Sequence, residues 1–170
     1  MDSSNNQTIG RVPFKGFGIR LVAYILDSII LMIITGIVFF VLTFTAGSLF
    51  GEGAAVGVFI ILIVVFIFAM LLYKPLMEAS EYQGTLGKYF LGMKIVNQKG
   101  RRITMTDSFV RTIVFLLQTS IPIINAVSWL GLVIIGFTEY KQGLHDMAAG
   151  TYVVSLHWEG SIPLEDNFGA

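Results

Sequence analysis

Residues 18–33 read GIRLVAYILDSIILMI, an apolar stretch that carries two charged side chains, Arg20 and Asp27. The run continues without another charge to Thr45, which makes it longer than the roughly 20 residues that a helix needs to cross a bilayer. Nearly two helical turns separate the two charges, so both lie on one helix face, about 10 Å apart along the axis. That distance is too long for a direct ion pair, and an unpaired charge inside a membrane costs at least about 2.5–3.5 kcal/mol. Each charge therefore predicts a partner on another segment.

The composition of the whole chain also indicates a membrane protein. The chain has 170 residues, of which 55% are hydrophobic and 13% charged; soluble domains have about 25% charged residues. A chain of this length cannot hide so much apolar surface in water, and lipid is the alternative solvent. Lysine plus arginine equal aspartate plus glutamate at 11 each, which argues against a nucleic-acid partner. The absence of cysteine excludes disulfides, thiolate metal sites and a cysteine nucleophile.

The apolar segments predict an all-α membrane protein, a small bundle of three to four transmembrane helices. Pro122 interrupts the last apolar stretch and divides it into two limbs. Either these limbs form a broken or re-entrant hairpin, or the first lies on the membrane surface and only the second crosses. The expected segments are an N-terminal tail at 1–18, apolar helices at 19–45, 54–73, 108–119 and 125–138, a loop at 74–107, and a flexible acidic tail at 155–170.

The basic residues predict the orientation of the chain in the membrane. Lysine and arginine favour the cytoplasmic side. The loop at 74–107 holds six of them, whereas the glycine-rich loop between the first two helices holds none. We therefore expect a cytoplasmic N-terminus and a cytoplasmic basic loop. Within this loop, residues 82–96 predict a short interfacial helix and residues 93–105 a β-hairpin around Gln98-Lys99-Gly100.

The remaining charges near the apolar segments bear on the C-terminal side. Arg111 opens the third apolar stretch, and His145-Asp146 follows the last one. If the C-terminal tail is cytoplasmic, Asp146 can reach Arg20 and Arg111 can reach towards Asp27. If it lies outside, Asp146 is separated from both arginines by the membrane. Charge matching favours both termini inside, with four apolar passes or a re-entrant hairpin.

These residues together resemble the RDD family of small bacterial membrane proteins, named for one arginine and two aspartates. GIRLVAYILD resembles the family's first helix, with Arg20 at its start and Asp27 in its middle. Further matches are QGTLGKYFLGMKIV, KGRRIT, Arg111 opening an apolar stretch, and GLHDMAAGTYVV with the second aspartate at Asp146. The likeness extends over residues 14–154 and implies a multi-pass protein of the bacterial plasma membrane. The family is mostly uncharacterised, and some members resemble cation or proton transporters.

Two functions follow as expectations for the cluster of Arg20, Asp27, Arg111 and Asp146. One is a structural or accessory membrane protein in which the charges hold helices together. The other is a small cation/proton antiporter with Asp27 as the carrier carboxylate. The sequence shows no arrangement of catalytic residues, and we expect neither an enzyme nor a cofactor nor a metal site. The expected partners are the lipid bilayer, a second copy or another membrane protein, and a monovalent cation or proton in the antiporter case.

The stretch GTLGK is an interfacial motif in this interpretation. Its glycines at Gly84 and Gly87 are too close for a phosphate-binding loop, and Tyr89 stands where that loop has serine or threonine. We interpret Gly84, Thr85 and Gly87 as a tight turn into the interfacial helix, with Lys88 meeting lipid headgroups or a buried acid. His145 is either a pH switch or a local hydrogen-bond partner of the neighbouring aspartate.

Overall fold

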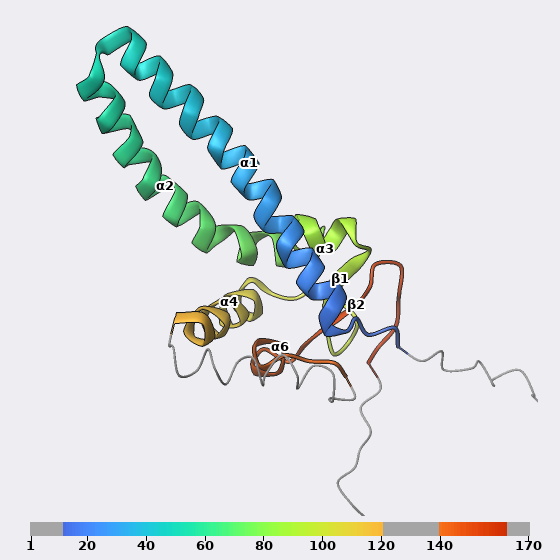
Figure 1. Ribbon diagram of the computed structural model, residues 1–170. Coiled ribbons are helices and arrows are strands. Elements are labelled where there is room, and N and C mark those ends of the chain that lie inside the picture. Colours follow the sequence, from blue (N-terminus) through green and yellow to red (C-terminus); the bar gives the residue numbers. More distant parts are fainter. Residues whose placement is uncertain (1–11, 121–139, 163–170) are drawn as a thin grey trace, which may run out of the picture.

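The computed structural model describes residues 12–120 and 140–162, and its dominant feature is a long antiparallel pair of helices (Figure 1). Helix α1 runs over Phe17–Phe50 and α2 over Glu52–Glu78. At 1.5 Å per residue their 34 and 27 residues extend about 51 Å and 40 Å, enough to cross a 30 Å hydrocarbon core. The glycine-rich segment expected as a loop is helical up to Phe50, and Gly51 alone makes the turn, with a φ of 89° that favours glycine.

The surface of this hairpin is apolar. The most hydrophobic windows of α1 and α2 are only 6% and 0% buried, whereas the core helix of a soluble protein would be mostly covered. Aromatic side chains such as Phe40, Phe44 and Phe68 are more than 60% exposed. The hairpin therefore has the length and the surface of a membrane-spanning pair.

A small mixed module lies at the end of the hairpin where α1 begins and α2 ends (Figure 1). It contains α3 (Leu86–Phe90), β1 (Met93–Asn97), α4 (Met105–Ser120), α6 (Leu144–Ala148) and β2 (Thr151–Ser155). The short helix α3 agrees with the interfacial helix predicted within residues 82–96. The limb predicted at 108–119 falls inside α4, and the limb predicted at 125–138 lies outside the described residues.

The predicted β-hairpin at 93–105 is wrong in its second strand. The turn after β1 forms, but β1 pairs antiparallel with β2, which places Ile95 opposite Val153. Residues after the turn cannot serve as a strand because Thr104 already caps α4: its hydroxyl accepts from Asp107 N–H at 3.2 Å, and the Asp107 carboxylate accepts from Thr104 N–H at 2.9 Å. The all-α prediction is thus corrected to a mostly helical fold with one two-stranded sheet.

The sheet is covered on both faces, because consecutive apolar residues of each strand point to opposite faces. On one face of the sheet, Ala23 of α1 and Ile103 pack against Met93, Ile95 and Val153. The other face packs Val96, Tyr152 and Val154 against Ile162, with Phe14 and Trp158 partly buried beside them. The N-terminal segment joins β2 through Lys15 N–H, which donates to the Val153 carbonyl at 3.0 Å.

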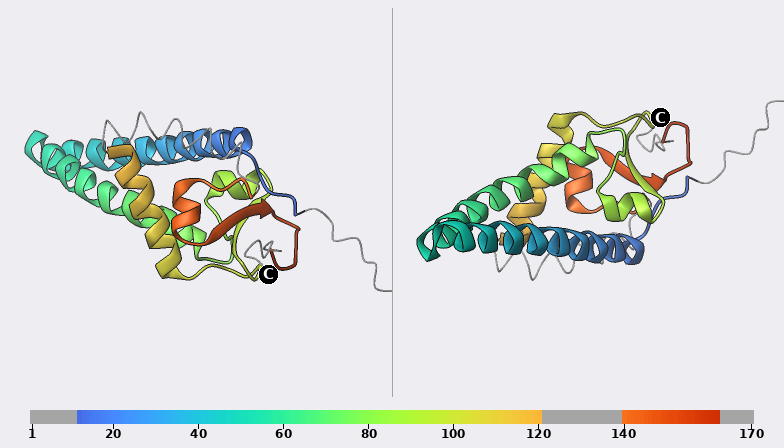
Figure 2. Two further views of the ribbon diagram at one scale, coloured as in Figure 1. Left: turned by 90° about the horizontal axis from the view of Figure 1, so that it is seen from below. Right: turned by 90° about the horizontal axis from the view of Figure 1, so that it is seen from above.

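Helix α4 has its polar side turned inward. Ser108, Arg111 and Thr112 are buried, while Ile113 and Leu117 on the opposite side are each 54% exposed. The helix crosses the axis of the α1–α2 hairpin instead of running beside it (Figure 2). The described part of α4, 16 residues, spans about 24 Å.

Candidate functional site: a buried charge network at the base of the hairpin

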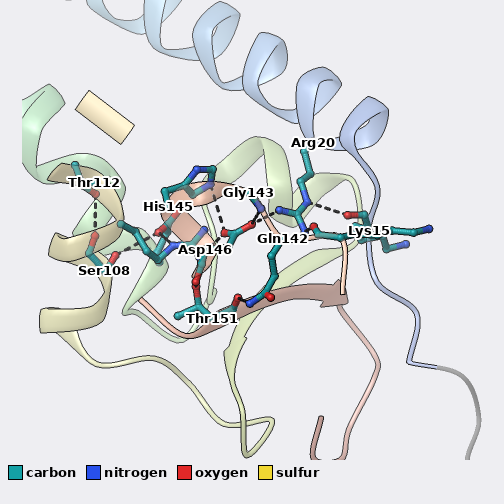
Figure 3. A network of polar contacts seen from close by, with 12 residues as sticks. Lys15, Arg20, Ser108, Thr112, Gln142, Gly143, His145, Asp146 and Thr151 are labelled. Atoms are coloured by element: carbon teal, nitrogen blue, oxygen red, sulfur yellow. Dashed lines mark hydrogen bonds and ion pairs between the residues drawn. The ribbon is translucent and has the colours of Figure 1, made fainter. Parts of the chain in front are cut away.

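Asp146 is the centre of the first group of buried charges. It lies in the first turn of α6 with its side chain fully buried, and one carboxylate oxygen accepts from Gly143 N–H at 2.9 Å, which caps the helix. The same oxygen is contacted by Nη1 of Arg20, and the other lies 2.6 Å from Nη1 of Arg111 (Figure 3). Two arginines from different helices therefore share one carboxylate, and its charge is balanced where water is excluded.

Arg20 is held by the backbone as well as by this ion pair. Its Nε donates to the Lys15 carbonyl at 2.8 Å, and Nη2 donates to the Lys141 carbonyl at 2.7 Å. The guanidinium thus joins the chain before α1 to the chain before α6. The ion pair between Arg20 and Asp146 bears out the prediction that Asp146 reaches Arg20.

Arg111 is fully buried and connects two acids. Its Nε donates to Oε2 of Glu78 at 3.0 Å, and Nη1 contacts both Asp146 and the hydroxyl of Thr151. The expectation that Arg111 reaches towards Asp27 is wrong. Arg111 projects from the inner side of α4, where Glu78 and Asp146 are its nearest anions.

Glu78 at the end of α2 was missed by the sequence analysis. It is fully buried, and Oε1 accepts from Lys88 Nζ at 2.7 Å while Oε2 also accepts from the Ser108 hydroxyl at 3.3 Å. The signal was present in the sequence: Glu78 is the first acid after an apolar segment that needs a partner for its charge. Of the two alternatives for Lys88, a lipid headgroup or a buried acid, the structure has the buried acid.

Asp27 lies apart from this network and is bound by neutral donors. Its carboxylate accepts from the Thr85 hydroxyl at 2.5 Å, from Gly87 N–H at 2.7 Å and from the Tyr73 hydroxyl at 3.0 Å. The Tyr73 oxygen in turn accepts from Leu86 N–H at 3.1 Å. Helix α1 and helix α2 together therefore cap α3, since the side chain of its own N-cap residue, Thr85, bonds to Asp27 and makes no capping hydrogen bond to the α3 backbone.

Gly87 explains part of the GTLGK motif. A Cβ at this position would lie 2.2 Å from the Ala23 carbonyl oxygen and 3.0 Å from the Asp27 carboxylate. Only glycine allows α3 to approach α1 this closely and to direct its N–H at Asp27. The motif is thus a turn and helix start shaped to receive a carboxylate from another helix.

His145 and Asp146 have opposite electrostatic situations although they are neighbours. Burial lowers the pKa of His145 to about 3, against the smaller opposing effect of the Asp146 charge. Burial alone would raise the pKa of Asp146, but Arg111 and the other cations outweigh it and hold the pKa well below its usual range. At neutral pH the structure therefore contains a neutral imidazole 3.4 Å from an ionised carboxylate. No three potential ligands among His, Cys, Asp and Glu gather as a metal site in the described ranges.

A two-helix apolar hairpin with a charge network at its base defines a small helical membrane protein. The RDD family model matches residues 14–150, and the chain belongs to the RDD family. It is 32% identical to "Uncharacterized protein YxaI" of Bacillus subtilis (strain 168) over 155 residues, which covers 82% of this chain and 95% of that protein. It is also 32% identical to "Uncharacterized protein YckC" of the same organism over 139 residues, which covers 81% and 82%. No solved structure matches.

Proposed function

We propose that the protein is a structural or accessory component of the bacterial plasma membrane, in which the charge network acts as a clasp. The observation that carries this proposal is the fully buried Arg111, whose guanidinium meets Glu78 from α2 and Asp146 from α6. With Arg20 on the same aspartate, the contacts join four helices at one point. Every charge of this group has a counter-charge, which is what a fixed support needs and what a mobile carrier site lacks.

The proposed orientation has both described ends of the chain on the cytoplasmic side. The six basic residues of the 74–107 loop favour that side. The pairing of β1 with β2 and the Arg20–Asp146 contact support the same side for residues 141–155. Accessibility of single cysteines introduced at Lys99 and at Glu52 to an impermeant thiol reagent in spheroplasts tests this: we expect labelling at Glu52 only. Labelling at Lys99 would show that the chain has the opposite orientation.

A double-mutant cycle tests the clasp itself. Removing one partner of a buried ion pair costs about 3–5 kcal/mol, so Arg20→Gln and Asp146→Asn should each destabilise the protein strongly in detergent. The double variant should cost less than the sum, with a coupling free energy of about 0.5–3 kcal/mol. Lys141→Gln is the matched control, since it removes a nearby positive charge while the backbone carbonyl that Arg20 uses remains. Additive effects of the two changes would contradict the clasp.

A cation/proton antiporter is the second candidate, and one observation favours it. Among the described residues, Asp27 is the buried acid without an ion pair, although it lies within a membrane-spanning helix. A carboxylate in that position is a candidate proton or cation site. The opposing observation is that three donors already occupy it.

Flux measurements in proteoliposomes separate the two candidates. An imposed sodium or potassium gradient should move no protons through the wild-type protein if the role is structural. Proton movement that is lost in a folded Asp27→Asn variant and kept in the Lys141→Gln control would instead establish the antiporter. Thermal unfolding in detergent gives the folding control for each variant.

A further inference from the structure

The side of the module formed by the turn after β1 carries a cleft with a basic lining. Its volume is about 770 Å³, within the range of small-molecule sites in proteins. The charged side chains that line it are Lys94, Lys99, Arg101 and Arg102, together with Glu81 and Glu159. This cleft shares no residue with the charge network or with the site of Asp27.

The four cations of the cleft are available to a ligand. In the described part of the chain, no ion pair joins any of them to an acid. Lys99, Arg101 and Arg102 are exposed, and with Lys94 the lining carries four positive charges against two negative ones. A concave surface with excess unpaired positive charge attracts anions, and guanidinium pairs suit the oxygens of a phosphate.

The turn that presents these side chains is held rigidly. The Asn97 side chain oxygen accepts from Lys99 N–H and from Arg101 N–H, each at 3.0 Å. The Asn97 N–H donates to the Arg101 carbonyl at 2.9 Å, so the turn is closed by backbone and side chain together. Gly100 adopts a φ of 71°, which favours glycine. The basic side chains thus project from a backbone that is already ordered before any ligand arrives.

The opposite wall of the cleft, formed by residues 159–161, is fixed against this turn. Ile162 N–H donates to the Gln98 carbonyl at 2.9 Å, and the Ile162 side chain is buried against Val96, Tyr152 and Val154 of the sheet. A Cβ on Gly100 would lie 1.6 Å from the Gly160 carbonyl oxygen, so the two backbones are in direct contact. The cleft therefore has two walls that hold each other in place.

We propose that this cleft binds a phosphate-bearing anion, supplied either as the headgroup of an anionic lipid or as a soluble phosphorylated molecule. The four cations would surround the phosphate, and the two glutamates would set a limit on affinity. The lipid source depends on the cytoplasmic orientation proposed above, because anionic headgroups attract basic segments at that leaflet. The binding chemistry itself does not depend on the orientation or on the structural role.

Thermal unfolding of the full chain in dodecyl maltoside, at constant ionic strength, tests the proposal. The probes are dihexanoyl-phosphatidylglycerol, its phosphatidylcholine counterpart and inorganic pyrophosphate. A ligand that binds the folded state raises the unfolding midpoint with concentration, which yields an apparent Kd for each variant relative to its own ligand-free midpoint. A response to phosphatidylglycerol alone assigns the lipid headgroup, and a response to pyrophosphate as well assigns phosphate recognition without a lipid requirement.

Two double variants with the same change of net charge give the decisive comparison. Arg101→Gln with Arg102→Gln should weaken binding by roughly fivefold per charge, because each cation near such a surface contributes about 1 kcal/mol. Lys15→Gln with Lys141→Gln, outside the cleft, should change the Kd less than twofold. Glu159→Gln should tighten binding. The proposal is overturned if no anionic probe raises the wild-type midpoint, or if both double variants weaken binding equally.

Discussion

Replacing Gly87 by alanine should separate α3 from α1. The new Cβ would lie 2.2 Å from the Ala23 carbonyl oxygen, a distance at which one of the two backbones must move. Overpacking of this kind costs about 1–3 kcal/mol. The movement also lengthens the 2.7 Å bond from Gly87 N–H to Asp27, and a hydrogen bond to a charged group contributes about 1.5–3 kcal/mol. We expect a loss of roughly 3 kcal/mol in the free energy of unfolding.

Equilibrium unfolding by dodecyl sulfate in mixed micelles measures this loss. Gly36→Ala is the matched control, because nothing lies within 4 Å of a Cβ there and alanine in a helix interior stabilises by roughly 0.5–1 kcal/mol. Gly87→Ala should also be non-additive with Asp27→Asn, since both changes weaken the same hydrogen bond. If Gly87→Ala unfolds within about 0.5 kcal/mol of the wild type, the close approach of α3 to α1 is refuted.

Three further changes test other parts of the structure. Arg111→Met should destabilise the protein by about 3–5 kcal/mol, because Glu78 and Asp146 each lose a buried cation, and adding Glu78→Gln should recover part of this loss in the same unfolding assay. The pKa of His145 is about 3 in the folded protein and about 6.5 in the unfolded chain, so the unfolded state binds more protons between these two pH values. The unfolding midpoint should therefore fall as the pH drops below 6.5, and His145→Gln should flatten this dependence. Thr104→Ala removes the cap of α4 and should cost about 1 kcal/mol, whereas an unchanged midpoint would show that the cap contributes nothing.

The helical hairpin and the pairing of Arg20 with Asp146 were predictable from the sequence for a physical reason. A long apolar run has few alternatives to a membrane helix, and a charge within it demands a partner, which led from Arg20 to Asp146. The partners of Arg111 and Asp27 were not predictable in the same way. Their choice depends on which side of α4 faces inward and on how closely α3 approaches α1, and neither is a property of a single segment.

The sheet illustrates the same limit. Residues 93–97 have the alternation of a strand, and a turn follows them, so the local pattern favours a hairpin. The better partner for β1 is Thr151–Ser155, of which four residues are buried in the module core. Competition between a local and a distant strand is decided by burial in the finished fold, and the sequence order alone cannot show it.

The distant origin of β2 also has a consequence for biogenesis. During synthesis α1 and α2 emerge first, and at about 5–20 residues per second Asp146 and β2 follow after a delay on the order of seconds. In that interval Arg20 and Arg111 have not yet met their shared carboxylate, and β1 has an open edge. The inserted hairpin therefore depends on segments that are synthesised later, and termination before Asp146 leaves a membrane-inserted protein with exposed charges and an unpaired strand for quality control to detect.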